Sequence, residues 1–78
     1  NLITNLPGSL LSHESAASRP ALRYRRHVAR MVSAYSAGRP RELIGLVNSQ
    51  GLMELAVREG SAAWMFNAKR GDRVELIL

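Results

Sequence analysis

The middle of the chain has the pattern of a β-hairpin, and this hairpin limits the fold more than any other stretch does. Glu42–Val47 is an apolar run of strand length, and Met53, Leu55 and Val57 alternate with polar or small residues at period two. The segment between them, Asn48–Gly51 (NSQG), contains asparagine and glycine, turn formers that tolerate positive φ. The sequence therefore predicts two antiparallel strands joined by a tight polar turn.

Two residues of this turn carry more polar groups than a turn requires. Ser49 adds a hydroxyl group and Gln50 adds an amide, next to backbone N–H groups that converge in a tight turn. Such a loop can hold a carboxylate or a ribose. Ordinary polar turns of this kind are common in small β domains, so the residues alone favour the ordinary turn and leave ligand binding as the alternative.

Shorter segments on both sides of the hairpin also have strand character. We expect strands over residues 1–5, 22–24, 27–35 and 73–77, where β-branched or alternating apolar residues end at turn signals. Ser61–Asn67 is expected to form a short helix, with Ser61 as its N-cap and Asn67 as a left-handed stop. The predicted fold is all-β, with about six or seven short antiparallel strands in a small barrel and one short helix.

Length and composition indicate one small domain over residues 1–78. At this length a single core buries only about 60% of the unfolded surface, so packing against a partner contributes to stability. The chain has no cysteine, which excludes disulfides and thiolate metal sites, and we expect no metal site. No apolar run reaches the roughly 18 to 20 residues that a membrane helix needs, so no membrane partner is expected.

The charge distribution raises a second possible function. The chain has 11 basic and 6 acidic residues, a formal net charge of +5, and basic residues are frequent between Arg19 and Arg41. In Arg23–His27, arginines surround Tyr24, a pattern that can contact phosphates and stack on bases. The alternative is a solvated strand edge, where charge prevents edge-to-edge pairing.

Several strings resemble one known family. The string NSQGLMELAVREGSAA, together with NLITN at the start, Tyr35 ahead of the hairpin and GDRVEL near the end, is similar to the C-terminal barrel of the S-adenosylmethionine (SAM) hydroxide adenosyltransferases. This family includes the SAM-dependent fluorinase and chlorinase. The residues that fit its pattern N-S-x-G-x-L-E-x-A are Asn48, Ser49, Gly51, Glu54 and Ala56, with Met53 in place of the usual leucine.

The resemblance implies a binding site for SAM, which is a substrate, and no cofactor. Asn1 is expected to hydrogen-bond the adenine, the Tyr35 ring to lie against the adenine face, and the main chain at Val57 and Glu59 to reach its edge. The residues expected at the methionine end are Asn48, Ser49, through its hydroxyl, and Gln50, through its backbone N–H. Glu54 lies on the polar side of the alternation, where a solvent-facing carboxylate is the ordinary case, and we expect it to have a structural role near the site rather than a catalytic one.

The resemblance also implies a larger parent protein. The chain begins at Asn1, within an expected strand, so we expect a fragment of a SAM hydrolase that also has an N-terminal α/β domain. SAM would bind between that domain and the barrel of a neighbouring subunit in a cytoplasmic homotrimer. No catalytic residue is expected in this chain, and the fragment alone is expected to be inactive.

Two further expectations concern the chemistry and the alternatives. The resemblance leaves hydroxide, chloride and fluoride open as nucleophiles, and Gln50, which stands where the fluorinase carries arginine, favours hydroxide. It also argues against a nucleic-acid partner. A basic nucleic-acid-binding barrel of the OB type and a structural oligomerisation module remain the alternative functions.

Overall fold

The structure of the chain is a computed structural model. It describes residues 2–11, 19–61 and 67–78. Within these residues the elements, in chain order, are β1 (Leu2–Pro7), η1 (Gly8–Leu11), β2 (Ala21–Tyr24), β3 (His27–Arg30), η2 (Tyr35–Ala37), β4 (Leu43–Val47), β5 (Leu52–Val57) and β6 (Val74–Ile77). The two η elements are single turns of 3₁₀ helix. The predicted all-β class is confirmed.

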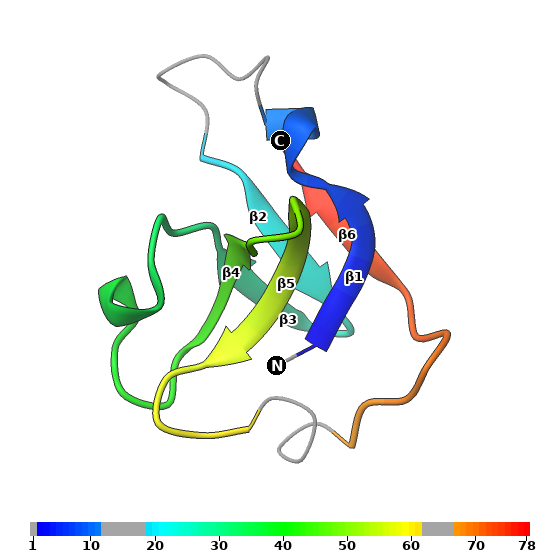
Figure 1. The fold of residues 1–78 in the computed structure, drawn as a ribbon. Helices are drawn as coiled ribbons and strands as arrows, with labels where there is room; N and C mark the ends of the chain where they lie inside the picture. The colour runs from blue at the N-terminus through cyan, green and yellow to red at the C-terminus, as the bar shows by residue number, and fades with distance from the viewer. Residues whose placement is uncertain (1, 12–18, 62–66) are drawn as a thin grey trace.

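The strands form two three-stranded antiparallel sheets, in the orders β1-β5-β4 and β3-β2-β6. Figure 1 shows the two sheets wrapped around a shared interior. On one side a parallel bridge between Met31 and Gly45 joins them, and the Val32 N–H donates to the Gly45 carbonyl at 2.8 Å. On the other side β1 pairs with β5 and β6 pairs with β2, so the described strands leave the expected barrel open there.

The core lies between the inner faces of the two sheets. The buried cluster consists of Leu22, Tyr24, Ala29, Met53 and Leu55. Each of the larger apolar side chains contributes about 1.5 to 3 kcal/mol when fully buried. The alternation in β5 predicted this cluster correctly for Met53 and Leu55, because period two places alternate side chains on one face of a strand.

Gly45 permits the close approach that joins the two sheets. A Cβ atom on Gly45 would lie 2.5 Å from Met31 Sδ and 3.1 Å from a Cδ atom of Leu22, shorter than ordinary van der Waals contact. The residue is buried in β4. Only glycine therefore lets β4 pass this close to the end of β3.

We expect Gly45→Ala to destabilise the domain by about 1 to 2 kcal/mol, the cost of overpacking a site where the neighbouring methionine can partly yield. A lower midpoint in urea denaturation, with an unchanged slope, would measure it. Combining Gly45→Ala with Met31→Ala should give a loss smaller than the sum of the two single losses, because the shorter side chain removes the clash. Additive losses would contradict the steric explanation.

The expected strand over residues 27–35 is wrong in its second half. Strand β3 ends at Arg30, Met31 forms the single bridge to the other sheet, and Tyr35 begins η2. The chain leaves β2 at this point because it crosses to the other sheet: the Met31 N–H donates to the Pro20 carbonyl, and the next N–H donates to Gly45. The single bridge at Met31 is too short to continue β3 as a strand.

The expected helix over residues 61–67 falls mostly on residues 62–66, outside the described residues. Its expected stop does lie in the described part. Asn67 has a φ of 50°, in the left-handed region that asparagine tolerates better than most residues. The left-handed conformation of Asn67 is therefore confirmed.

Candidate functional site

The hairpin turn is held by the side chain of Asn48. Its Oδ1 accepts the N–H groups of Gln50, at 2.9 Å, and Leu52, at 3.1 Å, and its backbone carbonyl accepts the Gly51 N–H at 3.0 Å. Within the turn only Gly51 has positive φ, at 80°, which gives a three-residue loop with a glycine bulge. Asn48 therefore shapes the turn through its side-chain oxygen rather than through a left-handed backbone.

The hydrogen bond from Gln50 limits what the turn can offer a ligand. The backbone N–H expected to bind a carboxylate already donates to Asn48 Oδ1. Ser49 and Gln50 are both exposed, and the part of the chain that the structure describes records no partner for the Ser49 hydroxyl. The Ser49 hydroxyl is thus the group of this turn best placed to receive a polar ligand.

The start of η1 supports the same turn from outside the hairpin. The Gly8 N–H donates to the Gly51 carbonyl at 2.7 Å. A Cβ atom on Gly8 would lie 2.6 Å from Val47 Cγ1, so glycine is needed for this contact too. The turn is consequently anchored to the start of η1 as well as to its own strands.

A second group of expected site residues meets at the other end of β5. The Tyr35 hydroxyl donates to the Val57 carbonyl at 3.0 Å and accepts the Glu59 N–H at 2.7 Å. Glu59 has a φ of 62°, and the Gly60 N–H closes the turn onto Val57 at 3.2 Å. The tyrosine hydroxyl therefore helps to hold Glu59 in a left-handed conformation that a non-glycine residue rarely adopts.

The loop that carries Tyr35 is joined to the turn after β5 by further contacts. Arg58 Nη1 donates to the Gly38 carbonyl at 2.8 Å, and the Arg41 N–H donates to the Arg58 carbonyl at 2.7 Å. The Tyr35 side chain nevertheless remains partly open, with 43% of the residue exposed. An aromatic surface is thus presented to solvent on a braced loop.

An ion pair fixes the base of this loop. Arg30 donates to both carboxylate oxygens of Glu42, at 2.8 and 3.0 Å, and the Arg39 N–H donates to the same carboxylate at 2.8 Å. The Arg30 hydrogen bonds, with that from Arg39, lower the pKa of Glu42 to about 2. The carboxylate therefore stays charged at neutral pH and keeps β3 tied to the start of β4.

The two groups of residues lie at opposite ends of one strand. The turn at 48–51 precedes β5 and the Tyr35 contacts follow it, as Figure 1 shows. Six residues of antiparallel strand span about 20 Å. A ligand that touched both groups would have to extend along β5.

The expected site residues therefore divide into three sets. The structure brings Tyr35, Val57 and Glu59 together, and it places Asn48, Ser49 and Gln50 together in one turn. Asn1 lies outside the described residues. Its neighbour Leu2 is opposite Leu55, so β1 begins beside the end of β5 that leads to Val57.

Glu54 does not face solvent, although its place in the polar alternation is typical of a solvent-facing carboxylate, and its structural role near the site stays a prediction. Glu54 is only 6% exposed. All five residues from Met53 to Val57 are buried, so both faces of this part of β5 are covered by the rest of the fold. The expected polar alternation along β5 therefore does not mark a solvent-facing side.

A third polar cluster, around Asp72, had no counterpart in the sequence patterns. The Tyr24 hydroxyl donates to Asp72 Oδ2 at 2.6 Å, and the Lys69 N–H donates to it at 2.9 Å. Burial raises the pKa of Tyr24, and the hydrogen bond from Tyr24 lowers the pKa of Asp72. Only the fold brings these residues together, because Tyr24 and Asp72 are 48 positions apart.

Two hollows adjoin this cluster. One, of about 230 Å³, lies among Arg23, Arg25, Arg73 and Glu75. The other, of about 560 Å³, lies between β1 and the turn that precedes β6. Within residues 2–11, 19–61 and 67–78, none of the residues expected to bind SAM lines either hollow. Among the residues that the structure describes, no helix has the length and apolar character to cross a bilayer.

Solved structures share this fold. A crystal structure of an uncharacterized conserved protein from Thermotoga maritima is 26% identical, with a TM-score of 0.75, over 96% of this chain and 30% of its own. A conserved hypothetical protein from Thermus thermophilus is 22% identical, with a TM-score of 0.72, over 81% of this chain and 27% of its own. The second likeness concerns the fold alone. The chain thus spans less than a third of either solved chain.

A search of curated proteins gives no match to this chain. A family model does match, over residues 1–75, which include both groups of residues at the ends of β5. This match agrees with the resemblance carried by the hairpin and its turn. The chain belongs to the family described as the SAM hydroxide adenosyltransferase C-terminal domain.

Proposed function

We propose that this domain binds SAM as the substrate-binding part of a SAM hydroxide adenosyltransferase, which hydrolyses SAM to adenosine and L-methionine. Family membership supports a SAM-related parent enzyme. The observation that carries the proposal is the position of the two polar groups at the two ends of β5. SAM is itself a molecule with two polar ends, an adenosine and an amino acid.

The adenosine end is assigned to the loop that carries Tyr35. Its ring is partly exposed while its hydroxyl is fixed, so the ring is available for stacking at little cost in side-chain entropy. The Val57 carbonyl, which has a second lone pair, lies beside it as an acceptor for the edge of the base, and the Glu59 N–H would serve as a donor after release from the Tyr35 hydroxyl. Asn1 would complete this end.

The amino-acid end is assigned to the hairpin turn. The Ser49 hydroxyl is exposed on a turn that Asn48 and Gly8 hold in place. A hydroxyl or N–H group can donate to the methionine carboxylate, and hydrogen bonds to a charged group are the stronger kind. Gln50 lies next to it and would contribute its amide or, after release from Asn48, its backbone N–H.

The chemistry itself is assigned to the rest of the parent protein. Methionine leaves SAM as a neutral thioether, so the reaction chiefly needs in-line positioning of SAM and an activated hydroxide. This domain would position SAM against an α/β domain of a neighbouring subunit in a homotrimer, in the cytoplasm. No cofactor is required by this scheme.

Ser49→Ala tests the amino-acid end. In the full-length trimer we expect SAM affinity to fall by about 1 to 2 kcal/mol, the cost of a lost hydrogen bond to a charged group, with adenosine affinity nearly unchanged. Isothermal calorimetry with both ligands would measure the two effects. Ser33→Ala, on an exposed serine away from the turn, is the control and should change neither affinity. Equal losses for SAM and adenosine would overturn the assignment of Ser49.

A further inference from the structure

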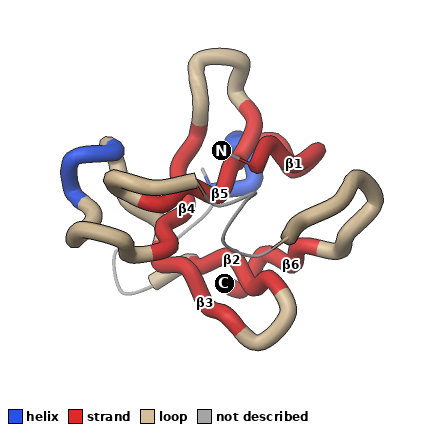
Figure 2. Tube along the Cα trace, turned by 90° about the horizontal axis from the view of Figure 1, so that it is seen from below, coloured by secondary structure: helices blue, strands red, loops and turns tan. Residues whose placement is uncertain are grey.

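On the open side of the fold, the described strands leave two edges without a neighbouring strand. In the described residues β1 pairs with β5 and β6 pairs with β2, and no ladder joins β1 to β6. Figure 2 shows β1 and β6 on the same side of the molecule with a gap between their traces. Edge strands present unpaired N–H and C=O groups, which are a template for another extended chain. Pro7, at the end of β1, is typical of an edge strand.

A groove of about 560 Å³ lies on this side, lined by Leu2–Asn5 of β1, by Tyr24, by residues 68–72 and by Val74. Its size is within the range of ligand-binding clefts in proteins. Ile3, on the wall of the groove, is 61% exposed. The groove therefore combines a free strand edge with apolar side chains.

The wall formed by β1 has a fixed shape. Its pairing with β5 changes register between Ile3 and Pro7. There the Thr4 hydroxyl donates to the Met53 carbonyl at 2.7 Å and accepts the Leu6 N–H at 3.0 Å, so a side chain bridges the irregular stretch. The hydrogen bonds of Thr4 thus bridge the irregular stretch within the sheet. The outer edge of β1 stays available for pairing with another strand.

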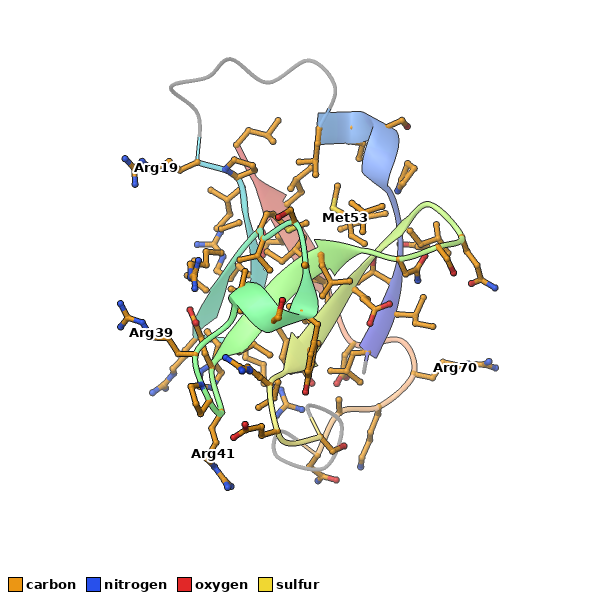
Figure 3. The ribbon with its side chains drawn as sticks, turned by 60° about the vertical axis from the view of Figure 1, so that its left-hand side comes forward. Arg19, Arg39, Arg41, Met53 and Arg70 are labelled. Carbon is orange, nitrogen blue, oxygen red and sulfur yellow. The ribbon has the colours of Figure 1, made fainter. Side chains whose placement is uncertain are left out.

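The rim of the groove is basic. Lys69 and Arg70 are exposed there, while the nearby Asp72 already receives hydrogen bonds from the Tyr24 hydroxyl and the Lys69 N–H. In Figure 3, Arg70 extends from one side of the molecule, and Arg19, Arg39 and Arg41 extend from the opposite side. A second copy of the chain would bring the same net charge of +5 to this rim, which opposes self-association through it.

We propose that this groove binds an extended, acidic segment of a partner polypeptide. The segment pairs through its main chain with the free edge of β1 over Leu2–Asn5 and places carboxylates against Lys69 and Arg70. Main-chain pairing supplies affinity in this mode, and the alternate side chains supply specificity. Figure 1 shows β1 and β6 running in the same direction, so a segment antiparallel to β1 is antiparallel to β6 as well.

The proposal is tested with a blocked hexapeptide of alternating valine and glutamate, fluorescently labelled, whose binding to the 78-residue chain is followed by anisotropy at low salt. We expect Lys69→Ser with Arg70→Ser to weaken binding about tenfold. Arg39→Ser with Arg41→Ser removes the same charge from the opposite side and should change the affinity less than about twofold. All four side chains are exposed, so we expect these substitutions to leave the stability of the fold unchanged. Unchanged midpoints of urea denaturation would confirm it.

Peptide variants separate strand pairing from simple charge attraction. N-methylation of alternate residues removes main-chain donors and should abolish binding, and lysine in place of glutamate should do the same. Absence of binding by the parent hexapeptide at millimolar concentration overturns the proposal, as does an equal loss in both charge variants. Tighter binding of a thymidine oligonucleotide that depends on Lys69 and Arg70 would instead assign the rim to nucleic acid and overturn the peptide assignment.

Discussion

Tyr35→Ala in the full-length parent protein is expected to weaken adenosine binding by about 1 to 3 kcal/mol, because the alanine removes the ring proposed to stack on the adenine. The same loss is expected for SAM, since both ligands carry the base. Calorimetry with each ligand would measure the effect. Adenosine affinity that does not change in Tyr35→Ala would remove Tyr35 from the base site.

Tyr35→Phe separates the ring from the hydroxyl. The hydroxyl occupies the Glu59 N–H and contacts the Val57 carbonyl, the two groups proposed to meet the edge of the base. Phenylalanine keeps the stacking surface and releases both groups, so we expect adenosine affinity at least equal to that of the unchanged protein. A loss as large as that of Tyr35→Ala would show that the hydroxyl, rather than the ring, carries the contribution of Tyr35, through the turn at Glu59.

The hairpin could be predicted because its determinants are local. Period-two alternation of Met53, Leu55 and Val57 marks the stretch as a strand, and a polar turn of four residues fixes where the two strands meet. Gly51 has the positive φ that the turn requires. The family resemblance rests on the same stretch, which explains why fold class and family were both predictable.

The site could be predicted only in part, because its arrangement depends on contacts distant in sequence. The hydrogen bonds of the Tyr35 hydroxyl join residues 22 and 24 positions apart, and no periodicity encodes them. The same holds for the burial of Glu54, since both faces of β5 are covered by parts of the chain that are distant in sequence. The groove beside β1 arises because the two sheets meet on one side only.

The end of β3 shows a similar limit. Apolar and small residues continue beyond Arg30, so a local pattern extends the strand to Tyr35. The chain instead crosses between sheets at Met31, where Gly45 admits its side chain. A strand end that is set by a partner strand cannot be located from the alternation of its own residues.

The 78-residue chain by itself is expected to release no adenosine from SAM, whereas the proposed full-length parent protein is expected to turn SAM over. An activated hydroxide requires a general base within hydrogen-bonding reach of the attacking water, or an equivalent polar cluster. Near the two ends of β5, the expected site residues offer an exposed hydroxyl, amide groups, an aromatic ring and the exposed carboxylate of Glu59, and we assign all of them to binding and positioning.

Incubating the purified chain with SAM and following adenosine release would measure this difference. Adding the separately purified α/β domain should restore part of the activity, because each part supplies groups that the other lacks and their association recovers some of the effective molarity of the intact site. Ser49→Ala in the added chain should reduce the restored rate, which ties the recovery to the hairpin turn. Adenosine release by the chain alone, in proportion to its concentration, would show that the activating groups lie within these residues after all.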